Sequence, residues 1–275
     1  MTGLPDYHVH TYRCGHAGGI SRDFVLKAIE RGISEIAFTD HIPLYFLPRS
    51  ERDPRLAMAE EEFEGYLHEV EALRDEFAGR IPVRLGLEAD YREGQEEVLA
   101  SWLGRADWDV VLGSVHWVAG GWIDAPGSAA RFEKEGTEGL YDEYYRLLAR
   151  AARTGLFDVL THFDLPKKFG NRPTDPRDES EQEAIAAARQ AGCAVEISSA
   201  GLRKPVGEAY PEARLLANMV AAGIPVTFSS DAHAPVEVGW GYEKTLELAR
   251  SCGVRQFVTF EGRRRVFHPL PSPAA

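Results

Sequence analysis

The chain has 275 residues, of which 44% are hydrophobic, so it is long enough to bury a substantial core as one domain. Its net charge of -12 argues against a nucleic-acid partner, because neutralising a phosphate backbone requires a basic face. No apolar run approaches the roughly 20 residues that span a membrane, and no signal-like leader follows Met1, so we expect a cytoplasmic protein.

Strand-like and helix-like segments alternate from one end of the chain to the other. Short apolar runs predict strands at residues 6–10, 36–41, 83–88, 110–115, 159–161, 194–197 and 226–230. Apolar residues spaced three and four apart predict helices near 21–31, 60–78, 93–105, 135–154, 178–191, 212–223 and 241–251. The strand runs lack clean alternation, as expected when both faces of a sheet are covered. Seven strand–helix units therefore predict an α/β protein with a closed or nearly closed parallel barrel, similar to a TIM barrel.

A residue type suited to metal binding stands at the carboxyl end of nearly every predicted strand. Histidine is the commonest metal ligand, and parallel barrels build their active sites from the carboxyl ends of their strands. An open doubly wound sheet would gather its ligands at one switch point, so their spread favours the barrel. The candidate metal ligands are His8, His10, His16, His41, Glu88, His116, His162, Asp231 and His233.

The spacing of these candidates supports a shared site. His8 and His10 lie two residues apart and therefore share one face of a strand. Asp231 and His233 repeat that spacing, and His16 lies in a glycine-rich turn that can fold back toward the first pair. A zinc-like ion takes three or four protein ligands, so nine candidates suit two or three ions.

Some positions leave alternatives open. Either Asp40 or His41 could be the ligand after the second strand, and we favour His41, with Asp40 orienting a neighbouring group. A lone histidine in the place of His116 or His162 is more often a hydrogen-bonded core residue than a ligand. Cys14 could be a nucleophile or a ligand, but we expect it to be an ordinary residue of the site lining. Three cysteines at long spacings suggest no disulfide framework, and the absence of a C-x-x-C motif excludes a structural zinc ribbon.

Two basic pairs follow strand ends and suggest an anion beside the metal cluster. Lys167 and Lys168 follow the strand that ends at residue 161, and Arg203 and Lys204 follow the sixth strand. Arginine is suited to bidentate recognition of phosphate. Solvated loop charge is the alternative reading for Lys167, and it is weaker for Arg203.

Two long loops, 43–60 and 117–135, leave the same end of the predicted barrel. Loops of this length either shape a binding pocket or are disordered surface excursions. The aromatic candidates for lining a pocket are Tyr12, Tyr45, Phe46 and Trp117. No G-x-S-x-G nucleophile elbow and no Walker loop are present.

Taken together, these residues resemble the PHP (polymerase and histidinol phosphatase) family. The resemblance covers about residues 6–260, leaves a Pro-rich tail at 268–275 and implies a single domain over 1–275. Within it, residues 12–16, 162–169 and 196–204 resemble the monofunctional histidinol-phosphate phosphatases of that family. Ser198 stands where that pattern has asparagine.

The resemblance implies a distorted seven-stranded (β/α) barrel of the PHP type that holds three divalent ions, which would be zinc, manganese or iron. The first ion would be bound by His8, His10, Glu88 and Asp231. The second would be bound by Glu88, His116 and His162, and the third by His16, His41 and His233. Lys168 and Arg203 would hold a phosphate group, with Lys167, Lys204, Cys14 and Ser198 as further candidates.

The implied activity is the hydrolysis of a small phosphate monoester, L-histidinol phosphate, in histidine biosynthesis. A water held by Asp231 or His233 would protonate the leaving alkoxide, and the sequence does not choose between the two. Alternatives are a PHP phosphodiesterase or nucleotide phosphatase, an amidohydrolase and a non-catalytic metal-binding module. An amidohydrolase would carry a bridging lysine where His116 stands, and a degenerate module would lack some ligands. We expect no nucleic-acid or membrane partner, and the oligomeric state is not predicted.

Overall fold

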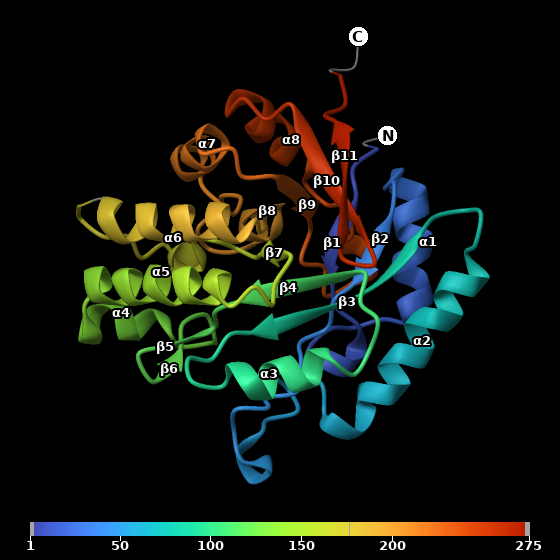
Figure 1. The fold of residues 1–275 in the computed structure, drawn as a ribbon, viewed down its shortest axis with the longest axis horizontal. Helices are drawn as coiled ribbons and strands as arrows, with labels where there is room; N and C mark the ends of the chain where they lie inside the picture. Colours follow the sequence, from blue (N-terminus) through green and yellow to red (C-terminus); the bar gives the residue numbers. More distant parts are fainter. Residues whose placement is uncertain (1–2, 176, 273–275) are drawn as a thin grey trace.

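A parallel seven-stranded sheet forms an almost closed barrel in the computed structural model, which describes residues 3–175 and 177–272 (Figure 1). The strands lie side by side in chain order, and each neighbouring pair is parallel. They are β1 (Asp6–Val9), β2 (Ile36–Phe38), β3 (Val83–Asp90), β4 (Val110–Ser114), β7 (Val159–Leu160), β8 (Ala194–Ser198) and β9 (Val226–Ser229). The predicted α/β barrel is therefore confirmed.

The first and last strands meet at their carboxyl ends. Val9 forms a parallel bridge with Ala232 just beyond β9. The His10 amide donates to the Ala232 carbonyl over 2.9 Å, and the Ala232 amide donates to the His8 carbonyl over 3.1 Å. Closure of the barrel thus places the segment that carries His8 and His10 directly against the segment around Ala232.

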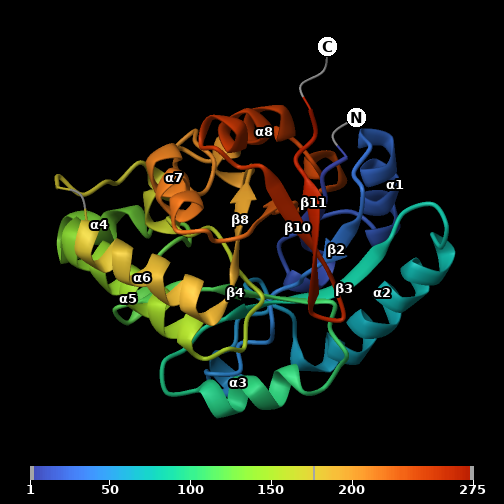
Figure 2. The same cartoon turned by 45° about the horizontal axis from the view of Figure 1, so that its top comes forward.

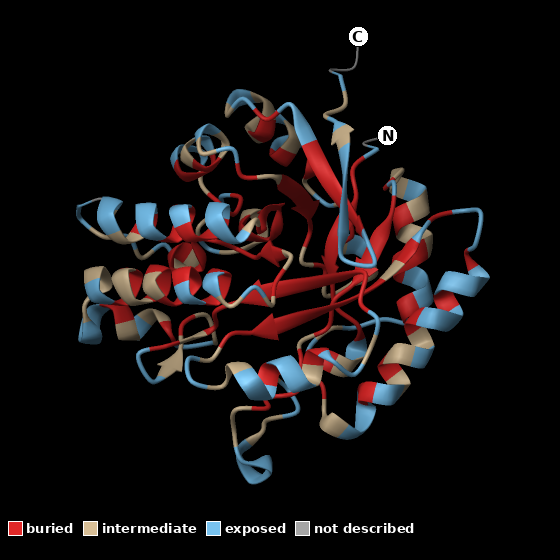
Figure 3. Ribbon diagram, viewed as in Figure 1, coloured by how far each residue is buried: buried red, intermediate tan, exposed pale blue. Residues whose placement is uncertain are grey.

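Eight helices in the described part of the chain cover the outside of the barrel (Figure 2). Their buried faces point toward the sheet and their exposed faces toward solvent (Figure 3). They are α1 (Ser21–Arg31), α2 (Phe63–Glu76), α3 (Glu96–Leu103), α4 (Ala129–Glu135), α5 (Thr137–Arg153), α6 (Asp178–Ala191), α7 (Ala213–Ala221) and α8 (Tyr242–Ser251). The bounds of α1 and α6 are those that the apolar spacing predicted. None of the helices described is both long enough and apolar enough to cross a membrane.

Two antiparallel hairpins were not predicted. The pair β5 (Trp117–Val118) and β6 (Gly121–Trp122) lies within the long loop at 117–135, where α4 also forms. The pair β10 (Gln256–Glu261) and β11 (Arg264–Pro269) ends the fold. Because β11 extends to Pro269, the tail expected at 268–275 begins two residues later than predicted. Residues 273–275 of that tail lie outside the described residues.

The β10–β11 hairpin closes the amino end of the barrel. Val258 and Phe260 of β10 share a buried cluster with the first residues of β4, β7 and β8. The Phe260 amide also donates to the Tyr7 hydroxyl over 2.6 Å. The hairpin is therefore part of the barrel core, although no periodic signal in the sequence identified it.

Replacing Phe260 with alanine should destabilise the protein by about 3–5 kcal/mol, because the cavity left in a closed core cannot collapse fully. Phe260 is 1% exposed, whereas Phe267 on the neighbouring β11 is 56% exposed and offers a matched control. The Phe267→Ala change should stay within about 0.5 kcal/mol of the parent. Urea denaturation of both variants measures the difference, and equal free energies of unfolding would show that β10 does not fill the barrel.

Candidate metal centre

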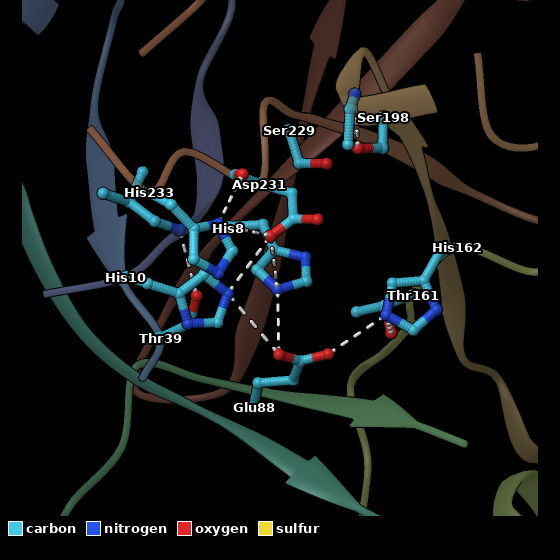
Figure 4. Close-up of polar contacts among 12 residues, drawn as sticks. His8, His10, Thr39, Glu88, Thr161, His162, Ser198, Ser229, Asp231 and His233 are labelled. Carbon is cyan, nitrogen blue, oxygen red and sulfur yellow. Dashed lines mark hydrogen bonds and ion pairs between the residues drawn. The ribbon is translucent and has the colours of Figure 1, made fainter. Parts of the chain in front are cut away.

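All nine predicted ligands meet at the carboxyl rim of the barrel. His8 and Glu88 belong to strands β1 and β3, and the others lie on segments that leave the strand ends. Figure 4 labels six of them (His8, His10, Glu88, His162, Asp231 and His233), with His8, His10 and His162 turned toward Glu88. The rim therefore brings together residues that are up to 225 positions apart, since His8 and His233 both belong to it.

Glu88 lies at the middle of this cluster and is 1% exposed. Its Oε2 atom lies 2.8 Å from the Nδ1 atom of His41, and its Oε1 atom lies 3.1 Å from the Nε2 atom of His162. Imidazole nitrogens within 3.6 Å of its carboxylate come from His8, His10, His41, His116 and His162. A single carboxylate at this position can contact more than one cation.

The ligand atoms form overlapping groups, each small enough to surround an ion. Within each group the atoms lie within 4.8 Å of one another. The groups are His8–His10–Glu88, His41–Glu88–His116, His16–His41–His233 and His10–Cys14–His233. The third group is the predicted third ion site, and the first contains three of the four ligands predicted for the first ion, without Asp231. In the second group His41 stands where His162 was expected. The described residues thus include His/carboxylate clusters able to hold metal ions.

Several buried polar atoms of the cluster have no hydrogen-bond partner among the described residues. They are Nε2 of His8, both ring nitrogens of His10, Oε2 of Glu88 and Nδ1 of His162. Each buried polar atom without a partner lowers the stability of a folded protein by about 1–3 kcal/mol, so a group of such atoms is unfavourable. Divalent ions bound among these atoms would remove that cost. The donor set therefore fits metal ions.

The electrostatics of the cluster also favour cations. Burial alone would raise the pKa of Glu88, but the surrounding imidazoles hold it well below its ordinary value. Asp231 behaves in the same way beside His8 and His10. Burial and neighbouring imidazoles lower the pKa of His16 to about 4. Against the effect of burial, neighbouring carboxylates raise the pKa of His8 well above its ordinary value and that of His116 to about 9. Because imidazoles bind metals in their neutral form, a cation that binds at these two residues displaces protons.

Two buried carboxylates position ligands from behind. Glu196, which is 1% exposed, accepts a hydrogen bond over 3.0 Å from Nδ1 of His8 and another over 2.7 Å from the His162 amide. Asp40 accepts from the Thr11 amide over 2.6 Å, and its Oδ1 atom lies 3.8 Å from Nδ1 of His10. His41, as favoured from the sequence, is therefore the residue of that pair that reaches the cluster.

The backbone is strained at two of the ligands. His162 and Asp231 have φ angles of 25° and 50°, a region that residues other than glycine rarely adopt. Glu196 holds the His162 amide, and Asp6 accepts from the Ser230 amide over 2.8 Å beside Asp231. Buried carboxylates thus stabilise the two unfavourable conformations that aim these side chains into the site.

The cluster opens into a cavity of about 590 Å³ whose walls come from both long loops. Leu44, Leu56 and Trp122 contribute apolar surface, and Asp53, Arg55 and Asp124 contribute charge. Both loops therefore shape the pocket, as one of the two alternatives proposed. None of the four aromatic residues predicted to line the pocket (Tyr12, Tyr45, Phe46 and Trp117) is among the lining residues described. The side chain of Tyr12 is instead 47% exposed to solvent. Phe46 and Trp117 instead pack behind Trp122, with ring centroids 6.5 and 5.3 Å from it.

The two lysines after His162 point in different directions. Lys168 lines the cavity, where its Nζ atom donates to the Asp124 carbonyl over 2.8 Å and lies 2.9 Å from the Asp124 carboxylate. Lys167 is 1% exposed and donates to the Ala209 carbonyl over 2.7 Å, away from the metal cluster. The structure therefore does not bring Lys167 to the site, and it is not a solvated loop charge either.

Arg203 lies beneath the loop that carries Asp231. Its Nη2 atom donates to the carbonyls of Ser230 and Asp231 over 2.8 and 3.1 Å, while Nε and Nη1 have no hydrogen-bond partner among the described residues. Lys204, the next residue, is the one that lines the cavity. A direct phosphate contact by Arg203 therefore stays a prediction.

Cys14 and Ser198 are both buried. Burial raises the pKa of the Cys14 thiol to about 12, which does not suit a free nucleophile. Its Sγ atom nevertheless lies within the His10–Cys14–His233 group. Ser198 accepts from the Ala200 amide over 3.3 Å and is absent from the described cavity lining.

Sequence reasoning missed two acidic residues of the centre. Glu196 could have been found, because a charged residue interrupts the apolar run at 194–197 and must be paired when buried. Asp124 lies in an irregular loop after β6, and nothing in its local sequence indicated that it would meet Lys168.

A parallel barrel with a histidine and carboxylate cluster at its carboxyl rim defines a metal-binding (β/α) barrel protein. The PHP domain model matches residues 6–200 of the chain. A Deinococcus radiodurans protein named "Probable histidinol-phosphatase" is 43% identical over 264 residues, which cover 96% of this chain and 99% of the relative. The "Histidinol-phosphatase" of Bacillus subtilis is 30% identical, with 88% of this chain and 98% of the relative covered. The chain therefore belongs to the PHP domain family.

A solved structure agrees with this assignment at the level of the fold. Histidinol phosphate phosphatase from Lactococcus lactis, solved with zinc, L-histidinol and phosphate, matches with a TM-score of 0.81 at 22% identity. The match covers 96% of this chain and 98% of that chain. The barrel and its flanking elements are thus shared over nearly their whole length.

Replacing Glu196 with glutamine should lower zinc affinity by about 10- to 100-fold, because His8 loses the carboxylate that orients its ring. Competition with a chelator of known affinity measures the change. Glu181→Gln is the matched control, since Glu181 is also 1% exposed but accepts from Arg214, away from the cavity. Unchanged zinc affinity in Glu196→Gln would show that Glu196 does not position the ligands.

Proposed function

We propose that this chain is a metal-dependent phosphoric monoester hydrolase that converts L-histidinol phosphate and water to L-histidinol and phosphate. The observation that carries the proposal is the metal-binding cluster, which opens into a cavity that is also lined by the cationic side chain of Lys168. The 43% identity to a relative named for this activity, over nearly the whole of both chains, supports the choice of substrate.

The finer assignment is a cluster of three divalent ions. We assign His8, His10, Glu88 and Asp231 to the first ion. The group of His16, His41 and His233, which is the most exposed of the ligand groups, supports a further ion. Glu88, His116 and His162 would hold the remaining ion, and His41, which shares a ligand group with Glu88 and His116, could bind there as well. Bound ions would lower the pKa of a coordinated water and neutralise charge on the phosphoryl oxygens. The His, Asp and Glu donors accept zinc, manganese and iron.

The protein side chains divide the remaining work. Lys168 places a positive charge where the phosphoryl oxygens enter, and Asp124 holds its ammonium group in position until they arrive. Lys204 adds a second cation to the wall. Asp231 and His233 line the cavity, with Oδ1 and Nδ1 3.4 Å apart. Either side chain could hold a water that protonates the leaving alkoxide.

Zinc- or manganese-loaded protein should release phosphate from L-histidinol phosphate much faster than from p-nitrophenyl phosphate, and should not cleave a dinucleotide. The dinucleotide tests the phosphodiesterase alternative, because its phosphodiester bond is a substrate for a phosphodiesterase but not for a phosphomonoester hydrolase. Inorganic phosphate release measures hydrolysis of the two monoesters, and chromatographic separation of nucleoside and nucleotide products measures cleavage of the dinucleotide, with chelator-treated protein as the blank. Cleavage of the dinucleotide, or no phosphate release from any ester by the metal-loaded protein, would contradict the proposal.

His116→Ala and Asp231→Asn should each lower turnover at least about a hundredfold, because each removes a ligand or a group that stabilises charge during the reaction. Circular dichroism should show that both variants keep their fold. Asp107→Asn, which changes an exposed aspartate, is the control and should retain parent activity. Near-normal activity in either site variant would contradict the cluster assignment.

Lys168→Ala should weaken competitive inhibition by inorganic phosphate by about tenfold or more, because a charge-assisted contact to the anion is lost. Lys134→Ala removes an exposed lysine and should leave inhibition unchanged. The inhibition constant for phosphate is the measurement. If Lys168→Ala is inhibited as strongly as the parent, another group holds the phosphate.

A further inference from the structure

The outermost metal-binding group depends on a loop as well as on strand ends. It consists of His16, His41 and His233, of which His16 is exposed and the other two are half-buried. Residues 53–58, which we call the strap, form part of the 43–60 loop and supply four residues of the cavity wall: Asp53, Arg55, Leu56 and Ala57. The strap contacts this group at two points.

The first contact fixes the ring of His16. Its Nδ1 atom lies 2.9 Å from the Cys14 carbonyl and 3.0 Å from the Arg55 carbonyl of the strap. Carbonyls only accept hydrogen bonds, so Nδ1 carries the proton and Nε2 has the free lone pair. That Nε2 atom lies 3.0 Å from Nε2 of His233. The Arg55 carbonyl therefore turns the ligand atom of His16 toward the cluster.

The second contact reaches His41. The Met58 amide donates to the His41 carbonyl over 3.3 Å, and Met58 is 2% exposed, so this end of the strap is anchored in the core. The other end is stabilised locally, because the Asp53 carboxylate accepts from the Arg55 amide over 2.9 Å. Two of the three ligands in the outermost group thus touch the same short segment.

Gly15 is the surface on which the strap packs. A Cβ atom at Gly15 would lie 1.8 Å from the Pro54 carbonyl oxygen and 2.8 Å from the Arg55 Cα atom. Both neighbours are backbone atoms, so any side chain at position 15 would push the strap away. The absence of a side chain here allows the Arg55 carbonyl to reach His16.

We propose that the strap positions His16 for the outermost metal ion, so that occupancy of this ion and packing of this part of the cavity wall depend on each other. The inference rests on the three-ion cluster of the proposed function. Arg55 acts through its carbonyl and is a positioning residue that does not touch the ion. Because binding linkage is reciprocal, the ion stabilises the packed strap to the same extent that the strap favours the ion.

The test measures zinc stoichiometry and stepwise affinity against a chelator of known affinity. The parent should bind three zinc ions, and Gly15→Ala should bind the weakest at least about tenfold less tightly. Gly79→Ala is the matched control: Gly79 has a φ of 76°, close to the 82° of Gly15, but no described atom lies within 4 Å of its added Cβ. It carries the same backbone strain without displacing a strap and should bind zinc like the parent.

A second variant covers the case in which Gly15→Ala does not fold. Asp53→Ala removes the partly exposed carboxylate that holds the Arg55 amide, and it should also weaken the third ion. In addition, Gly15→Ala should not weaken zinc binding further when His16 is already alanine, because the strap acts through that ring.

Zinc should slow trypsin cleavage after Arg55, whose side chain is 82% exposed, in the parent but not in His16→Ala.

The outcomes separate the two proposals. Parent-like binding of the third zinc in both Gly15→Ala and Asp53→Ala would overturn the strap proposal and leave the three-ion cluster intact. Only two zinc ions in the parent would overturn the three-ion cluster and the strap proposal together. The phosphate-release assay then decides independently whether the chain hydrolyses L-histidinol phosphate.

Discussion

The burial of an ionised Glu88 at the centre of the rim is the constraint on which the metal centre depends. Removing a carboxylate from water is costly unless positive or hydrogen-bonding groups surround it. Here imidazoles from five histidines lie within 3.6 Å of its oxygens, and they come from four strand ends. Three of those histidines (His8, His10 and His162) have buried ring nitrogens without a hydrogen-bond partner among the described residues. Cations bound between the carboxylate and these imidazoles would satisfy both.

Barrel closure and this cluster stabilise each other. The bridge between Val9 and Ala232 joins the first and last strands at the level of the ligands, and the backbone at Asp231 adopts a left-handed conformation there. Asp6 and Glu196 hold the adjoining segments through buried hydrogen bonds. The hairpin at the opposite end fills the barrel with Val258 and Phe260 and leaves the carboxyl end free for chemistry.

The inner ligands of the metal centre are held more firmly by the fold than the outer ones. The inner ligands His8, His10 and Glu88 are fully buried on or beside strands, whereas His16 is exposed and shares its Nδ1 hydrogen with a loop. Strand positions are set by the sheet hydrogen bonds, but a loop position depends on weaker local contacts.

What the sequence determined by itself was the order of strands and helices and the nine positions at the strand ends. Apolar periodicity is local, so it predicted α1 and α6 to the residue, and parallel strands must present their carboxyl ends together. The sequence also indicated Glu88 as a ligand, because it stands at the end of a predicted strand. Only the tertiary structure decided that Lys168 faces the cavity while Lys167 is buried behind it, and that Arg203 supports the Asp231 loop. It also decided that β10 fills the barrel and that Arg55 reaches His16. These contacts join segments far apart in the chain, and side-chain direction in an irregular loop follows from packing, which no local pattern encodes.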